Sequence, residues 1–152
     1  SFRFRDTEPY CQNPVPGARF LAMDLTRDRA LPVLEPVNVQ DKFGRFSDYW
    51  SQKIVGELNG QLVKLVKLRG EFVWHKHDNE DELFLVVKGH LRIEFRERHV
   101  WLNEGEFLIV PRGVEHRPVA EEEVHVMLFE PASTLNTGNV QSDRTVPNLD
   151  RI

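Results

Sequence analysis

Two histidines, His75 and His77, stand one residue apart in a segment whose residue pattern favours a β-strand. Because successive side chains of a strand point to opposite faces, residues two apart point to the same side. Two neutral imidazoles on one side of a strand supply half of the ligands that a metal centre needs. The pair alone is also compatible with a solvated turn, but its joint spacing with the glycines and the other candidate ligands favours a metal site, at which either redox or Lewis-acid chemistry can take place.

An oxygen ligand could come from the acidic residues that follow the turn after His77. The candidates are Glu80, Asp81 and Glu82. Glu82 opens the next predicted strand and shares the parity of Phe84 and Val86, so we expect it to point into the same apolar interior. Glu80 is the main alternative, because it also lies within a turn of His77.

Three further residues are candidates from later in the chain. His116 follows a turn signal at residues 111–113 and is the best candidate for a fourth ligand. Arg112 lies in that turn, where a guanidinium could hold an anionic substrate, although a solvated arginine is the alternative. His125 stands between two valines and is either an outward strand residue or part of a pocket lining.

The elements that must position these residues are short strands. Eight apolar or alternating segments, separated by turn signals, are expected at 62–68, 72–77, 82–87, 91–95, 99–102, 107–110, 115–119 and 124–129. Their spacing of about ten residues favours an all-β sandwich or barrel. The acidic run 121–123 is expected to be a hairpin tip. Four apolar residues are expected in the core: Phe84, Val86, Ile109 and Phe129.

The two ends of the chain differ from this region. Residues 1–36 hold five of the nine prolines and are expected to form an extension with one short strand at 19–25. It is a mobile tail, a vector-derived stretch, or an arm that pairs with another subunit's sheet edge. Residues 37–131 are expected to form the barrel, and residues 132–152 a polar surface tail. Near the start of the barrel, Asn38 or Asp41 could cap a short helix that buries Phe43, Phe46 and Trp50.

Composition narrows the classes of partner. Twenty basic against 24 acidic residues give a formal charge of −4, which argues against nucleic acid. The longest apolar run, 83–87, is far too short to span a membrane. Cys11 is the single cysteine, so no internal disulfide can form, and the N-terminus lacks the apolar run of a signal peptide. These features predict a cytoplasmic protein.

The candidate ligands and the glycines around them resemble the two motifs of the cupins, the RmlC-like superfamily of small β-barrels. The first motif is matched by Gly70, His75, His77, Glu82 and Gly89. The second motif is matched by Gly105, Pro111, Gly113 and His116. Two departures are a shorter spacing between Gly70 and His75, and Ala120 where the second motif usually ends in asparagine. The resemblance covers roughly residues 60–130 and implies an all-β, single-domain jelly-roll barrel.

The same resemblance implies that one divalent metal is held by His75, His77, Glu82 and His116. Imidazole and carboxylate ligands suit Fe, Mn, Zn, Ni or Cu without selecting among them. It also implies a small-molecule ligand or substrate, a homodimer, and either dioxygenase-type or sugar-phosphate isomerase-like chemistry. Isomerisation needs a general base, for which only Glu80 or His125 offers itself, so oxygen chemistry is slightly favoured. The alternatives are a non-catalytic metal- or ligand-binding module and, third, a purely structural protein.

Overall fold

The structure is a computed structural model that describes residues 4–6, 21–23 and 34–152. The chain divides into two units, Ser1–Pro36 and Val37–Ile152. In the first unit, β1 (Phe4–Asp6) pairs antiparallel with β2 (Leu21–Met23), which lies inside the strand predicted at 19–25. The rest of the predicted extension falls outside the described residues. Within the described part of the chain, no helix has the length and apolar character that a membrane crossing requires.

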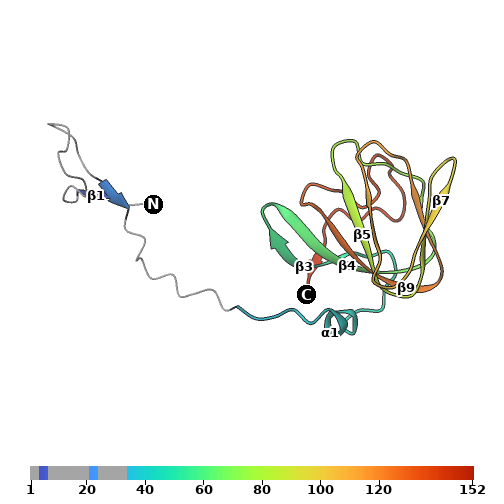
Figure 1. The fold of residues 1–152 in the computed structure, drawn as a ribbon, viewed down its shortest axis with the longest axis horizontal. Helices are drawn as coiled ribbons and strands as arrows, with labels where there is room; N and C mark the ends of the chain where they lie inside the picture. Colours follow the sequence, from blue (N-terminus) through green and yellow to red (C-terminus); the bar gives the residue numbers. More distant parts are fainter. Residues whose placement is uncertain (1–3, 7–20, 24–33) are drawn as a thin grey trace. The chain divides into compact units, whose positions relative to one another are not determined.

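Strands make up nearly all of the regular secondary structure of the second unit (Figure 1). Its strands are β3 (Lys53–Leu58), β4 (Gln61–Glu71), β5 (Glu82–Lys88), β6 (Leu91–Glu94), β7 (His99–Leu102), β8 (Phe107–Val110), β9 (Arg117–Pro131) and β10 (Asp150–Arg151). They pair in the order β10-β3-β4-β9-β5-β8, and β6 joins β9 to β7. All pairs are antiparallel except β10 with β3. The all-β prediction is thus confirmed.

The core lies on the inner face of the curved sheet. On β5 the alternation places Phe84 and Val86 inside, as predicted, together with Glu82. The prediction for Ile109 is wrong, since this side chain is 52% exposed. On β8 the inward parity belongs to Leu108 and Val110, so Ile109 faces out. Phe129 is only half-buried.

The acidic run 121–123 is not a hairpin tip. It lies inside β9, a single strand of 15 residues that pairs with β6 at its start and with β4 and β5 further along. The glutamates are exposed and have partners: Glu121 lies 3.4 Å from the Arg92 guanidinium, and Glu123 accepts a hydrogen bond from the Tyr49 hydroxyl at 2.8 Å. A charged triplet is therefore accommodated on the solvent side of a strand.

Three other differences concern strand boundaries. Residues 72–77 form no continuous strand, although His75 makes a single bridge to His116. β4 does not stop before Gly70 but passes through it, with a positive φ of 80° and a register shift between Leu68 and Gly70. β3 was not predicted, because Gly56 and the polar residues beside it interrupt its apolar pattern.

The predicted helix is shorter than its aromatic pattern suggests. α1 (Val39–Phe43) has Asn38 as its N-cap and ends at Gly44. Phe43 is its one buried residue, and its ring stacks on the His125 ring with 4.4 Å between centroids. Trp50 lies well beyond the helix end, with a positive φ of 61°.

Asn38→Ala is expected to destabilise the protein by about 1 kcal/mol. The Asn38 side chain accepts a hydrogen bond from the backbone N–H of Asp41 at 3.2 Å, and alanine leaves that donor without its partner. Urea unfolding followed by tryptophan fluorescence measures the change, with the exposed Asn148→Ala as control. Equal midpoints for the two variants would show that the cap contributes nothing.

The segment after Pro131 differs most from its prediction as a surface tail. Thr134, Asn136 and Thr137 are buried, and β10 adds to the sheet edge at β3. In Figure 1 the red C-terminal trace ends beside β3. The polar groups bond one another: the Thr137 and Thr145 hydroxyls are 2.9 Å apart, and the Asn136 amide donates to the Arg144 carbonyl at 2.7 Å. Polar composition therefore did not mean exposure here, because the segment satisfies its own hydrogen bonds.

Candidate metal centre

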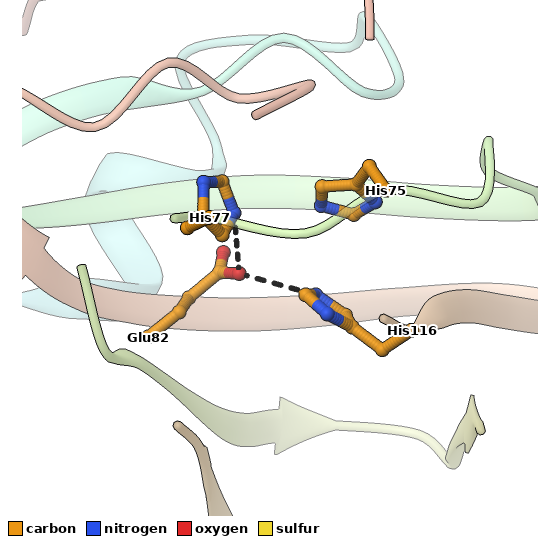
Figure 2. A group of neighbouring side chains, drawn as sticks. All are labelled: His75, His77, Glu82 and His116. Carbon is orange, nitrogen blue, oxygen red and sulfur yellow. Dashed lines mark hydrogen bonds and ion pairs between the residues drawn. The ribbon is translucent and has the colours of Figure 1, made fainter. Parts of the chain in front are cut away.

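Four side chains from separate parts of the chain converge inside the barrel. They are His75, His77, Glu82 and His116, and one ligand atom from each lies within 4.8 Å of the others. All four residues are at most 4% exposed. Figure 2 shows the three imidazoles arranged around the Glu82 carboxylate. The structure thus brings together the four residues that the motif resemblance implied.

Backbone hydrogen bonds align the segments that carry the histidines. His75 and His116 exchange two of them, with N···O distances of 3.1 and 2.9 Å. The N–H of Gly113 donates to the His77 carbonyl at 2.6 Å, and Gly113 has a positive φ of 77° that favours glycine. Glu82 is the first residue of β5, where its pairing with Val110 sets which way it faces. The ligands are therefore held by main-chain pairing rather than by loose loops.

Two of the imidazoles are oriented by carbonyl groups behind them. Nδ1 of His75 lies 3.0 Å from the Val73 carbonyl, and Nδ1 of His116 lies 3.0 Å from the Val114 carbonyl. Since a carbonyl oxygen only accepts, each Nδ1 must carry the proton. In neutral imidazoles Nε2 then keeps its lone pair, which is the form that binds a metal.

The Glu82 carboxylate is the one anion of the cluster. Its Oε2 lies 3.1 Å from Nε2 of His77 and 3.4 Å from Nε2 of His116 (Figure 2). Burial by itself raises the pKa of Glu82, but the adjacent imidazoles of His116 and His77 lower it to about 2. Burial, with the nearby His116, lowers the pKa of His75 to about 4. At neutral pH, Glu82 is ionised and His75 is neutral, and both forms are ready to bind a metal.

The donor set fits a single transition-metal ion. Within the described residues, Nε2 of His116 is buried and makes no hydrogen bond, although a buried nitrogen normally has a partner. Three imidazole nitrogens and one carboxylate oxygen suit Mn, Fe, Ni, Cu or Zn, and none of the four residues is a cysteine that would indicate a thiolate site. The cluster could therefore hold one metal ion.

Comparison with known proteins decides the family. The Cupin domain family model matches residues 62–130. The crystal structure of a cupin-2 domain containing protein from Shewanella frigidimarina is 46% identical, with a TM-score of 0.62. That match covers 62% of this chain and 93% of the Shewanella protein. This chain belongs to the cupin family. The predicted jelly-roll fold of a small cupin is thereby confirmed.

Two further proteins are similar to this chain. A crystal structure of a Neisseria meningitidis protein is 30% identical with a TM-score of 0.60, over 64% of this cupin and 100% of that protein. The uncharacterized protein YdbB of Bacillus subtilis is 35% identical over 80 residues, which is 52% of this cupin. The match spans 65% of YdbB, slightly less than two thirds of its length.

A small space beside the cluster, here called the inner cavity, offers room next to the ligands. Its volume is about 30 Å³. Its walls are mainly aromatic and aliphatic, and they include the stacked rings of Trp50 and Phe72, 4.9 Å apart. Besides His75 and Glu82, its polar lining consists of Gln52 and Asn136. No motif marks these two amides, so reasoning from the sequence missed them.

The structure does not bring the other candidates to the cluster. The Arg112 side chain is 63% exposed and binds Asp81, with its Nε 3.3 Å from the carboxylate. His125 is buried on the face of β9 opposite to Val126, and its Nε2 lies 2.8 Å from Glu123. Glu80, the alternative ligand, accepts a hydrogen bond from the Ser133 hydroxyl instead. None of the three lines the inner cavity.

Proposed function

We propose that this cupin binds one divalent transition metal through His75, His77, Glu82 and His116, and uses it to oxidise a small molecule in dioxygenase-type chemistry. The observation that carries the proposal is the convergence of four buried ligand atoms, including one nitrogen without a hydrogen bond. Burying four such groups in an apolar barrel is unfavourable unless something binds them. A metal ion satisfies all of them at once.

The chain's own residues prepare the site for the ion. The carbonyls of Val73 and Val114 fix the tautomers of His75 and His116, so that both Nε2 atoms face the cluster. The Glu82 carboxylate would offset part of the positive charge of the ion. When bound, the metal supplies open coordination positions for redox or Lewis-acid chemistry. The apolar walls of the inner cavity limit access of water to the metal site.

The cavity lining favours oxidation over isomerisation. An isomerase that moves a proton needs a general base near the substrate. Among the described residues that line the inner cavity, the groups other than the two ligands are apolar or are amides, which do not titrate. Glu80 and His125, the bases considered from the sequence, lie elsewhere. Oxygen-dependent chemistry places no such requirement on the protein.

A second candidate function is metal binding without turnover. The size of the inner cavity favours it, because about 30 Å³ holds roughly two water molecules, whereas pockets for organic ligands are typically about 300–1,000 Å³. A metal-binding module would have no need for a larger space.

Elemental analysis of tag-free protein is the first test. We expect about one equivalent of a transition metal in the wild type and almost none in His75→Ala/His77→Ala, because that variant loses two of four ligands. The matched control is His90→Ala/His99→Ala, which removes two exposed histidines outside the cluster and should retain the metal.

Both outcomes of the test are informative about the function. Equal metal content in the two double variants, or none in the wild type after reconstitution, would contradict the metal site. If the metal is bound, oxygen uptake with a panel of small enolic and thiol substrates separates the two candidates. Consumption that depends on the metal supports the enzyme, and its absence across the panel supports the binding module.

A further inference from the structure

The C-terminal segment contributes to one wall of the inner cavity. Asn136 lines this cavity, and it belongs to the segment between β9 and β10, residues 132–149, which we name the cap. The space inside is too small for an organic substrate while the cap is in place. Whether such a molecule can enter therefore depends on whether the cap can move.

A second, larger space lies on the other side of the same turn of the cap. This outer hollow measures about 210 Å³ and is polar. Its lining includes the ligand His77, the acidic loop residues Asp78 and Glu80, and the cap residues Gly138 and Asn139. Residues of one short turn therefore line both spaces. Moving that turn away from the barrel would widen both spaces beside the metal ligands.

We propose that the cap is a movable cover that must lift off the barrel to admit substrate, and that Arg144 is its latch. This inference rests on the proposed function in one respect only, which is that the molecule admitted is the substrate. The opening of the cap itself does not require a bound metal.

The cap has internal bonds that let it move as one body. Asn136 ties the two limbs of the cap together, since its amide donates to the Arg144 carbonyl and its oxygen accepts from the Val146 N–H at 2.9 Å. The hydroxyl of Thr145 contacts that of Thr137 and accepts from the N–H of Ser142. These bonds lie within residues 136–146 and are not broken when the cap leaves the barrel.

Few hydrogen bonds hold the cap to the barrel. At its start, the Ala132 N–H donates to the Gly60 carbonyl at 2.9 Å and the Ser133 hydroxyl donates to Glu80 at 3.1 Å. The Arg144 guanidinium lies over the rings of Trp50 and Phe72, 5.2 and 5.9 Å from their centroids, and donates to the Glu71 carbonyl. Trp50 and Phe72 are walls of the inner cavity, so Arg144 closes the cavity at its aromatic side. Contacts of this kind are weak beside a strand ladder, which makes local opening accessible.

A second contact seats the cap on the metal-ligand segment. Asn139 makes two hydrogen bonds to the backbone of Lys76, one through its side-chain oxygen at 3.0 Å and one through its N–H at 3.1 Å. Gly138 packs so closely that an added Cβ would lie 2.2 Å from the Lys76 carbonyl oxygen, and its φ of +51° also disfavours a side chain. Gly138→Ala should therefore lift the cap without touching Arg144.

Thiol labelling of metal-free protein tests the cap. In a Cys11→Ser background, Val66→Cys places a thiol on β4 in the wall of the inner cavity, and Val86→Cys places one in the core outside that wall. The probe is 5,5′-dithiobis(2-nitrobenzoic acid), which is far larger than the closed cavity. We expect Arg144→Ala to raise the labelling rate at position 66 at least tenfold, Gly138→Ala to do the same, and neither to change the rate at position 86.

Three results would overturn the proposal. The first is an unchanged rate at position 66 in both variants, since the cap would then not limit access. The second is equal acceleration at positions 66 and 86, because labelling would then follow opening of the whole barrel. The third is a rise with Gly138→Ala alone, which would exclude Arg144 as the latch. Because no metal is present, failure here leaves the metal content of the protein untouched as a separate result.

Discussion

Lys64→Met is expected to lower the free energy of unfolding by about 3–5 kcal/mol. Lys64 and Glu130 form an ion pair whose side chains are both fully buried, with Nζ 2.7 Å from Oε1. The ammonium also donates to Gln52 at 3.2 Å, and Gln52 lines the inner cavity. Removing one partner leaves a buried polar group without its counter-charge, which is far worse than losing an exposed pair.

The double variant Lys64→Met/Glu130→Leu should recover most of this loss. Burial and the negative charge of Glu82 raise the pKa of Glu130 to about 8, and the neighbouring Lys64 ammonium opposes this rise. One of its oxygens is buried without a hydrogen bond within the described part of the chain. Replacing both residues by apolar ones of similar size removes these penalties together.

Urea unfolding of the two single variants and the double variant measures the coupling between the partners. The matched control is Arg151→Met, which breaks the half-exposed pair of Arg151 with Glu57 and should change stability by at most about 1 kcal/mol. Single variants at positions 64 and 130 that lose no more than this control would contradict the prediction. So would a double variant that loses as much as the two single variants added together.

Local sequence patterns made the residues of the cluster the leading candidates, with Glu80 left open as a ligand, and the motif resemblance implied the full set. The alternation of β5 was enough to orient Glu82 with Phe84 and Val86. Gly113 marked a turn of the chain and does have the positive φ that such a turn requires, whereas Gly70 lies inside β4. The same reasoning failed by one residue at Ile109, since a strand of four residues carries too little alternation to fix its phase.

Other features depend on contacts between distant residues, which no local pattern reports. Lys64 and Glu130 are 66 positions apart, and each alone resembles an ordinary charged residue of a strand. The cap was predicted as a surface tail because its residues are polar. In the structure these polar groups bond each other rather than water. The acidic run in β9 was predicted as a hairpin tip because consecutive charged residues are typical of turns. In the strand, two of its glutamates each have a partner from another segment, which a local pattern does not report.

His75→Asn is expected to make the metal-free protein more resistant to acid. Burial, with the nearby His116, lowers the pKa of His75 to about 4 in the folded state, whereas an unfolded histidine titrates near 6.5. Between these two values the unfolded chain binds a proton that the folded chain does not. The wild type therefore loses stability as the pH falls from about 6.5 to 4, by about 3 kcal/mol from this residue.

Other groups make the comparison with a variant necessary. The raised pKa of Glu130 acts in the opposite direction, because its folded form holds a proton that the unfolded chain releases above its ordinary value of 4.5. The lowered pKa of Glu82 adds acid sensitivity below 4.5. Subtracting the two pH profiles cancels the part of these contributions that the substitution leaves unchanged. Asparagine suits the purpose, since its amide can replace the Nδ1 donor to the Val73 carbonyl.

The difference in unfolding free energy between His75→Asn and wild type, measured in urea with a chelator present, should therefore grow in favour of the variant from pH 6.5 to pH 4. His99→Asn, on the exposed side of β7, is the control and should follow the wild type throughout. A difference that stays constant over this range would mean that His75 titrates alike in the folded and unfolded chains. Its imidazole would then not be held neutral by the barrel, and metal binding near pH 5 would have to compete with a proton at that position.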